Sequence, residues 1–410
     1  MLREFSVANF LSFRETVKIS FLIRKSKDIV AVKKGNRDYI NKLGLLFGAN
    51  ASGKSNLLKA IGSIFSILTS SRSDNQPLIP EYTPFVLDEG KPISLGASFY
   101  KGDTRYDYSV DYTHKTILSE QLYYYPNGKR VLFYSRVHQG EGVNAKINIG
   151  PSLGISDEIK EKITDYTVAN KSVLAVITTN TFPSPIPQFS ELHDWVKNYS
   201  RFIEAPRLDP SQIHKLLSEV KNDNKKYKFF TRLLHKADFN IIDFSTLSTI
   251  NSKGEKISET FFKINTKERD FELPLDAQSN GTLQFLQLAE NLYRLITSPT
   301  LLCIDELGED LHLELLYYYL MCFLYNSEDS QLLLTTQEVS LLNDSFFNDN
   351  RQLILLIEKN KETAASECTR GDEFELAKDK SFYNSYIRGR LGAKPLTGSF
   401  LFNDDDDEEA

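Results

Sequence analysis

The residues with the clearest chemical meaning are the eight at 48–55, which spell GANASGKS and fit the pattern G-x-x-x-x-G-K-[ST]. In this pattern the backbone N–H groups of a glycine-rich loop surround phosphates, the lysine reaches the β- and γ-phosphates, and the hydroxyl binds Mg²⁺. Lys54 and Ser55 would have the last two roles. We therefore expect a site for a nucleoside triphosphate with Mg²⁺. Its expected lining is Gly48, Asn50, Ala51, Ser52, Gly53, Lys54, Ser55 and Asn56.

The flanking residues supply the context that such a loop needs. Residues 43–47 form a short apolar run typical of a buried strand, and residues 55–68 carry apolar side chains at helical spacing. The loop would therefore join a strand to a helix, which directs the helix N-terminus at the phosphates. An ordinary glycine-rich turn is the alternative, and this context argues against it.

Two acidic residues follow a second apolar run. Residues 301–304 are LLCI, and Asp305 and Glu306 come directly after them. Asp305 would hold Mg²⁺, directly or through water, and Glu306 would orient or deprotonate the attacking water. Apolar runs that end in acids are common, so the pair gains its meaning from the phosphate loop. A glutamate here favours a water-activating hydrolase over a small GTPase or a nucleotide kinase.

A third candidate lies between these two, in residues 275–282, LDAQSNGT. Ser279 and Gly281 stand at the start of an amphipathic helix predicted for 281–296. A hydroxyl and a glycine at a helix N-terminus can bind an anion. A plain N-cap without a ligand explains the same residues, and both explanations stay open.

Together these motifs resemble the ABC-type ATPases of the SMC, Rad50 and RecF kind, and within them the bacterial AAA-15/AAA-21 proteins typified by RloA and the OLD-family ATPase domain. The resemblance covers nearly the whole chain. Further stretches that carry it are NFLSF at 9–13, the runs from 105–108 to 132–134, ADFNI at 237–241, QSNGT at 278–282, the residues 302–312 and the residues 386–395.

The resemblance implies a head domain that dimerises around two ATP molecules. Each ATP would be held by the phosphate loop of one subunit and by Ser279 and Gly281 of the other, and His312 would lie where the subunits meet. Gln337 stands where the family usually has a switch histidine. A neutral amide can donate a hydrogen bond but cannot become cationic. With Glu306 and Gln337 as the catalytic residues, we therefore expect slow hydrolysis of ATP.

The elements that must position these residues alternate between strands and helices. Buried strands are expected at 331–335 and 352–357, with a helix at 313–324. Residues 93–136 carry alternating runs separated by turns, which predict an antiparallel sheet, and residues 157–236 are helical. The sequence thus predicts an α/β fold with a largely parallel core sheet, an antiparallel β-subdomain and a helical insertion. The resemblance implies that this fold is an ABC-type P-loop ATPase head.

This pattern suggests four parts of the chain. We expect an N-terminal ATPase lobe at 1–150, a helical insertion subdomain at 151–237, and a C-terminal ATPase lobe with the signature, Walker B and switch region at 238–400. A disordered acidic tail is expected at 401–410.

Charge excludes two classes of protein. The chain has 49 Lys and Arg against 55 Asp and Glu, and six of the acids lie together at 404–409, so the rest is formally neutral. A uniformly basic nucleic-acid-coating protein and a uniformly acidic protein are both excluded. The first 60 residues carry 12 Lys and Arg against 4 Asp and Glu, which we interpret as a solvated, partly phosphate-facing lobe rather than a nucleic-acid patch.

The compartment is expected to be reducing. Three cysteines without a CxxC pair, and six histidines without metal-binding spacing, argue against a disulfide framework and a zinc site. No apolar stretch is long enough for a secretory segment or a membrane span, so we expect a soluble cytoplasmic protein with no membrane partner.

The expected partners follow from what the chain lacks. It has neither a long coiled-coil arm nor an acidic cluster that resembles a TOPRIM nuclease, which implies a partner that carries the effector. The resemblance implies that an ATP-driven homodimer or higher oligomer controls this separate effector, a nuclease or toxin, in defence against phage. A RecF-like DNA-binding repair ATPase is the alternative, and direct binding of nucleic acid stays open. The subunit of a membrane transporter is a weaker third possibility because of the second sheet and the helical insertion.

Overall fold

The structure is a computed structural model. It describes residues 1–24, 29–70, 78–140, 143, 145–179, 182–183, 185–203, 209–237, 239–250, 256–308, 311–376 and 380–394, with the backbone alone at 248–250 and 256–258. The predicted acidic tail at 401–410 and Asp238 of the ADFNI stretch lie outside the described residues.

The core is a six-stranded sheet in which all but one strand are parallel. Its order is β12 (Ser200–Ile203), β16 (Leu301–Ile304), β17 (Gln331–Thr335), β6 (Leu43–Phe47), β18 (Ile354–Lys359) and β19 (Ser366–Arg370), and only β19 runs antiparallel, against β18. The prediction of a largely parallel α/β core is therefore confirmed.

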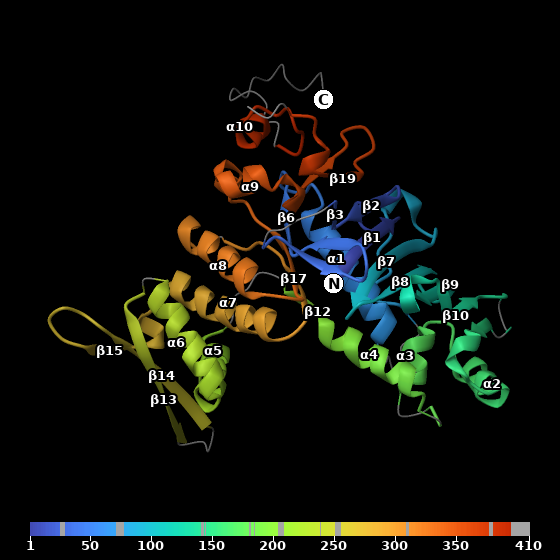
Figure 1. Cartoon of the computed structure of the whole chain (residues 1–410), viewed down its shortest axis with the longest axis horizontal. Coiled ribbons are helices and arrows are strands. Elements are labelled where there is room, and N and C mark those ends of the chain that lie inside the picture. Colours follow the sequence, from blue (N-terminus) through green and yellow to red (C-terminus); the bar gives the residue numbers. More distant parts are fainter. Residues whose placement is uncertain are drawn as a thin grey trace, which may run out of the picture.

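Alternating side chains of the core sheet enter two hydrophobic clusters. In β17, Leu332 and Leu334 pack with the helices α7 (Asn280–Thr297) and α8 (Leu313–Asn326), whereas Leu333 packs with α1 (Lys54–Thr69). Strands buried on both faces are typical of parallel sheets, which explains the continuous apolar runs in the sequence. Figure 1 shows α7 and α8 on one side of this sheet and α1 on the other.

An antiparallel sheet of seven strands covers α1 on the side away from the core sheet (Figure 1). The predicted antiparallel sheet is confirmed, and it extends beyond 93–136 at both edges. In spatial order the strands are β11 (Lys146–Ile149), β10 (Val131–Val137), β9 (Ile117–Tyr124), β8 (Thr104–Tyr112), β7 (Ile93–Lys101), β1 (Leu2–Ala8) and β2 (Val17–Ser20).

The helices expected between 157 and 236 form two groups, because β12 lies between them in the chain and joins the core sheet. The first group packs beside α1 and the seven-stranded sheet, and the second packs beside α7 (Figure 1). The first is α2 (Asp157–Tyr166), α3 (Val173–Ile177) and α4 (Pro187–Tyr199), and the second is α5 (Pro210–Asn222) and α6 (Asn224–Lys236). The bounds of the four predicted parts stay a proposal.

Two small sheets complete the strands. The strands β13 (Ile241–Ile250), β14 (Lys256–Ile264) and β15 (Phe271–Pro274) form an antiparallel sheet that extends past α5 and α6 at the lower left of Figure 1. The other sheet has the order β3 (Leu22–Ile23), β5 (Asp38–Asn41) and β4 (Ala31–Lys34).

Short helices connect the remaining elements. The α-helices are α9 (Ser345–Asp349) and α10 (Phe382–Ile387), and the 3₁₀ turns are Val86–Asp88, Pro126–Gly128, Pro151–Leu153, Leu275–Ala277, Val339–Asn343, Arg351–Leu353 and Gly371–Glu373. Within the described ranges, no helix combines the length and the apolar character needed to cross a membrane.

Part of the basic surplus near the N-terminus has a structural use. Lys34 is 5% exposed and its ammonium lies 2.7 Å from the Asp329 carboxylate. The Lys42 ammonium is equally buried and donates to the carbonyl oxygens of Leu324 and Ser327, where α8 ends. These charges are not available on the surface to nucleic acid.

Candidate nucleotide site

The predicted phosphate loop follows β6, and its last two residues, Lys54 and Ser55, are the first two of α1. Ala51 and Gly53 adopt left-handed backbone conformations, with φ of 61° and 111°. A Cβ atom on Gly48 would lie 2.3 Å from the carbonyl oxygen of Ile357. At position 48 a side chain would clash with the neighbouring backbone, so glycine is required there. At position 53 glycine is favoured because the backbone has a positive φ.

The Lys54 side chain folds back over its own loop. Its ammonium donates to the carbonyl oxygens of Gly48 and Ala49, at 2.9 and 3.0 Å. Burial lowers the pKa of Lys54, and the nearby carboxylates of Asp305 and Glu306 act in the opposite direction. The lysine thus lies between the loop and the acidic pair, where it can reach a terminal phosphate.

A cavity of about 430 Å³ opens beside this loop. It brings together the predicted residues from Asn50 to Asn56 with Glu306 and Gln337, which come from the ends of β16 and β17. Its complete lining is Ser12, Asn50, Ala51, Ser52, Gly53, Lys54, Ser55, Asn56, Glu306, Thr335, Thr336, Gln337 and Lys359. Gly48 lines an adjoining cavity of about 580 Å³ that shares several of these residues.

Thr335 holds the acidic pair in place, and the sequence analysis did not identify it. Its hydroxyl donates to Asp305 Oδ1 over 2.6 Å, and the backbone N–H of Glu306 donates to the same hydroxyl oxygen over 2.7 Å. Glu306 also has a left-handed φ of 55° and an exposed side chain. The carboxylate of Asp305 is thereby held by Thr335 and is absent from the lining of the cavity, whereas Glu306 lines it.

The polar groups of the loop fit a nucleotide with Mg²⁺. The Ser52 hydroxyl is buried and has no hydrogen-bond partner within the described residues, so a phosphate oxygen would satisfy it. Ser55 and Asp305 would contribute the hydroxyl and the carboxylate to Mg²⁺, which in such sites keeps further ligands from phosphates and water. The bound metal would neutralise charge on the phosphates.

Two further serines support the loop from outside it. The Ser366 hydroxyl, at the start of β19, donates to the Ser52 carbonyl oxygen, and it lies 2.7 Å from Ser12 Oγ. Asn56 donates to the same Ser12 oxygen over 2.9 Å. Ser12 belongs to the NFLSF stretch, but the sequence analysis gave it no role in the site, and no local pattern signals Ser366.

Lys359 is a second cation of the cavity and was also missed. It ends β18, next to the strand that leads into the phosphate loop. Its position at the carboxyl end of a parallel strand, where ligands of α/β sheets bind, was the available signal.

The candidate signature lies outside this cavity. Ser279 caps α7, since its hydroxyl accepts from the N–H of Thr282 over 3.1 Å, and both Ser279 and Gly281 are absent from the lining. Within one chain the plain N-cap therefore accounts for Ser279. Ser279 and Gly281 could contact a nucleotide in this cavity only if a second chain supplied them. Their roles in ATP binding therefore stay predictions.

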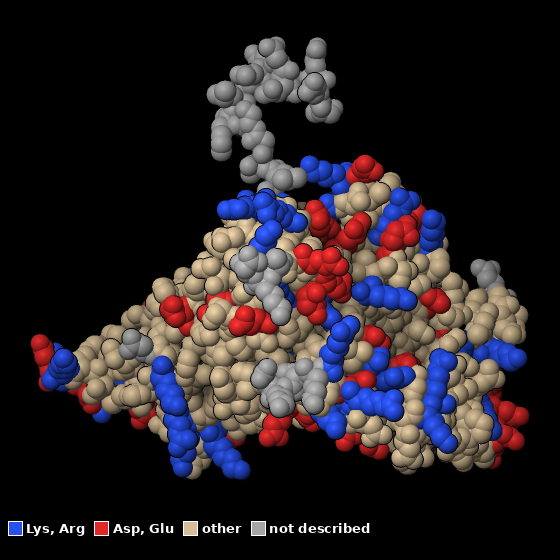
Figure 2. All heavy atoms as spheres, turned by 45° about the horizontal axis from the view of Figure 1, so that its top comes forward, with Lys and Arg blue, Asp and Glu red and all other residues tan. Residues whose placement is uncertain are grey.

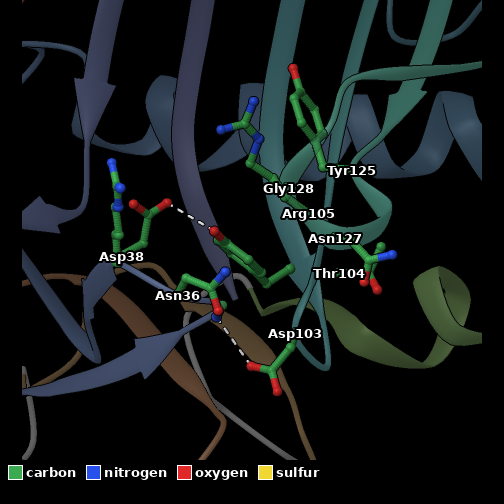
Figure 3. A pocket seen from close by; sticks show the side chains of 11 residues that line it. Asn36, Asp38, Asp103, Thr104, Arg105, Tyr125, Asn127 and Gly128 are labelled. Atoms are coloured by element: carbon green, nitrogen blue, oxygen red, sulfur yellow. Dashed lines mark hydrogen bonds between the residues drawn. The ribbon is translucent and has the colours of Figure 1, made fainter.

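A second polar cavity, of about 580 Å³, lies between the turn before β5 and the hairpin of β7 and β8 (Figure 3). Some of its polar groups contact one another: the Tyr100 hydroxyl donates to Asp38, and the Arg105 guanidinium stacks 3.5 Å from the centre of the Tyr125 ring. The Nε atom of Arg105 has no hydrogen-bond partner within the described residues. None of the predicted site residues lines it.

Comparison with known families gives a match over nearly three-quarters of the chain. The AAA_21 model, described as "AAA domain, putative AbiEii toxin, Type IV TA system", matches residues 45–343. This range contains the phosphate loop, the candidate signature and the acidic pair. A search of curated proteins gave no match.

Three solved structures of SMC heads are similar at 13% identity. The SMC head bound to the C-winged helix domain of ScpA has a TM-score of 0.45, over 91% of this chain and 99% of that one. The SMC head domain from Thermotoga maritima has a TM-score of 0.41, over 92% and 99%. The SMC head with an extended coiled coil, bound to the C-terminal domain of ScpA derived from Pyrococcus furiosus, has a TM-score of 0.38, over 96% and 99%.

Proposed function

The chain belongs to the AAA_21 family of AAA domains, and we propose that it binds ATP with Mg²⁺, dimerises around the nucleotide and hydrolyses it slowly to ADP and phosphate. The recognition of an AAA-21-type ATPase domain is confirmed by this family, whereas the likeness to RloA and the OLD family remains a prediction.

One observation carries the proposal: a single cavity combines the phosphate loop with Glu306 and Gln337. Lys54 reaches the phosphates, Ser55 and Asp305 hold Mg²⁺, and Glu306 activates the attacking water. Gln337 donates a hydrogen bond to the γ-phosphate. Because it stays neutral, it stabilises the developing charge less than a cationic histidine would, which makes hydrolysis slow.

The position of the signature supports a dimer. Ser279 is exposed at the start of α7, outside the cavity of its own chain. In an arrangement of two chains, each α7 N-terminus would face the γ-phosphate bound by the other chain and supply backbone N–H groups to it. His312, exposed at the start of α8, would lie in the same interface.

The cellular role that we propose is a sensor or scaffold that controls a separate effector, a nuclease or toxin, in defence against phage. Two observations support it. The description of the family names a toxin of a type IV toxin–antitoxin system. In addition, no coiled-coil arm of SMC length joins the described elements, in which the longest helix is α7 with 18 residues.

A RecF-like repair ATPase remains the second candidate because of the basic surplus in the first 60 residues. Lys34 and Lys42, however, are buried in structural contacts. On the face in Figure 2, basic and acidic side chains are interspersed, with acids gathered near the centre and no continuous basic track. This face favours the sensor over a protein that clamps duplex DNA.

The test is the Glu306→Gln variant, which keeps the shape of the side chain but removes the base. ATP should stay bound, so a closed dimer should accumulate when ATP and Mg²⁺ are added, and the hydrolysis rate should fall at least about 100-fold. Size-exclusion chromatography with light scattering and a phosphate-release assay measure the two effects.

Glu338→Gln, one residue after the switch position, is the matched control and should behave as wild type. If Glu306→Gln hydrolyses ATP at the wild-type rate and shows no ATP-dependent association, then both the base and the sandwich arrangement are wrong.

A further inference from the structure

Helix α6 carries a row of cations along one side. Lys225, Lys228, Arg232 and Lys236 follow one another at helical spacing, and all are exposed. Within the described residues none of them has an ion pair. The neighbouring Lys226 is different, since its ammonium lies 2.6 Å from the Glu290 carboxylate of α7. That acid is therefore already neutralised and does not compensate the row.

The row borders an apolar groove. A cavity of about 420 Å³ lies between α6, α7 and α8, with the four cations and Asn326 at its rim. Its floor is Phe229, Leu233, Leu292, Ile296, Tyr318 and Cys322. Cys322 and Lys236 are close enough for the cation to lower the pKa of the thiol, although burial raises that pKa overall. The cations and the apolar floor thus belong to one surface, which we call the α6 groove.

An occupant of the α6 groove needs apolar side chains next to several negative charges. Residues 400–409 of this chain are FLFNDDDDEE, three large apolar residues followed by six acids after one asparagine. The sequence has no comparable run of acidic residues elsewhere. In this segment the apolar residues stand almost next to the acidic run. Apolar area and charge of the segment therefore both match the groove.

We propose that the α6 groove is the docking site of segment 400–409 of a neighbouring copy of this chain, with Phe400 and Phe402 over the apolar floor and the acids against the row of cations. The last described residue before the segment is Lys394. The six residues from there to Phe400 span at most about 20 Å when extended. Lys394 lies beside α10, since its ammonium donates to the Ile387 carbonyl oxygen, and Figure 1 shows α8 and α9 between α10 and α6. The segment that we place in the groove is therefore that of a neighbouring copy.

The groove suits this segment better than a nucleic acid. Phosphate contacts need cations but no apolar cavity, and duplex DNA would leave the floor uncovered. A single strand could stack bases on Phe229 or Tyr318, so an oligonucleotide is the competing occupant in the test. The proposal is independent of the proposed function, because it uses neither the nucleotide site nor the dimer.

The experiment uses the full chain with its own acids neutralised by Asp404→Asn, Asp405→Asn, Asp406→Asn, Asp407→Asn, Glu408→Gln and Glu409→Gln. A fluorescent peptide of residues 398–410 with the natural sequence should bind this protein saturably, as measured by anisotropy. Adding Lys228→Glu and Arg232→Glu should weaken binding about tenfold or more. Raising the salt concentration from about 0.1 M to about 1 M should also weaken it, because the contacts are exposed.

A matched pair of charge reversals, Lys33→Glu with Lys115→Glu, lies on exposed residues of the other lobe and should leave the affinity unchanged. A peptide with Phe400→Ser and Phe402→Ser should bind at least about threefold more weakly, since two apolar contacts are lost. Saturating natural peptide should slow alkylation of Cys322, whereas alkylation of Cys368, which lies in β19, should not change.

Three results would overturn the proposal. The first is absence of saturable binding, and the second is equal binding by the protein with Lys228→Glu and Arg232→Glu. The third is a single-stranded oligonucleotide of the same charge that protects Cys322 at lower concentration than the peptide does. Because the reversed residues are exposed, thermal melting should show that these variants fold as the parent does.

Discussion

The Ser366 hydroxyl donates a hydrogen bond to the Ser52 carbonyl oxygen over 2.5 Å, across 314 positions of the chain. Ser366 also donates its backbone N–H to the Ser12 carbonyl oxygen over 2.7 Å. A Cβ atom at Gly53 would lie 2.3 Å from the Ser366 hydroxyl oxygen. Three distant segments therefore meet at one buried serine, and the conformation of the phosphate loop depends on it.

Ser366→Ala should weaken ATP binding without abolishing it. The substitution leaves the Ser52 carbonyl without its donor, and a hydrogen bond of this kind contributes about 1 kcal/mol, which corresponds to about fivefold in affinity. A fluorescent nucleotide titration measures the change. Thr363→Ala, in the turn of the same hairpin, is the control and should bind ATP as wild type does. Equal affinities for the two variants would show that Ser366 does not position the loop.

Lys54→Ala should lower ATP affinity at least about 100-fold, because the terminal phosphates lose their charged partner and are left to backbone dipoles. The matched control is Lys59→Ala, on the same helix but absent from the cavity lining. Isothermal titration with ATP and Mg²⁺ compares the two. Micromolar affinity retained by Lys54→Ala would contradict the assignment of the phosphate loop.

The parts of the site that the sequence predicted are those encoded by local patterns. Strand β6, strand β17 and helix α1 have bounds within one residue of those expected from apolar spacing. The phosphate loop was predicted from its own pattern and from the apolar strand before it, and Glu306 from its place one residue after Asp305 at the end of a second apolar run. Hydrophobic periodicity is a local property, so it predicted the elements and the residues at their ends.

The parts that the sequence did not predict depend on contacts between distant segments. The Thr335 hydroxyl donates to Asp305, and the Ser366 hydroxyl donates to Ser52. The sequence around a single hydroxyl does not indicate which distant residue it will bind. Strand β12 has four residues between two helical stretches, and its pairing with β16 decides its conformation. Tertiary context overrides local propensity in such short strands.

Lys42 predicts an unusual dependence of stability on pH. Burial lowers its pKa from 10.5 to about 8 in the folded protein. Between these two values the unfolded chain binds a proton that the folded chain does not, so the free energy of unfolding rises with pH in this window. Relative to Lys42→Met, which cannot titrate, wild type should gain up to about 3 kcal/mol from pH 8 to pH 10.5.

Urea denaturation of wild type and Lys42→Met at several pH values measures this difference directly. Other lysines and tyrosines titrate in the same range, but they are common to both proteins and cancel in the comparison. A constant difference in unfolding free energy across the window would mean that Lys42 stays protonated at the end of α8.

The last prediction concerns which chain supplies the signature. Lys54→Ala removes the phosphate contact of one site, and Ser279→Arg blocks the N-terminus of α7. If the signature acts on the other chain's nucleotide, a mixed dimer has one site with neither lesion, whereas each variant alone has none. Equal mixing should then restore about a quarter of the wild-type ATPase rate, because half of the dimers are mixed and each has one intact site.

Mixing either variant with Lys54→Ala, Ser279→Arg double-mutant chains is the control and should restore nothing. No recovery at any ratio, with mixed dimers shown by tagged pull-down, would place the signature on its own chain or outside the reaction.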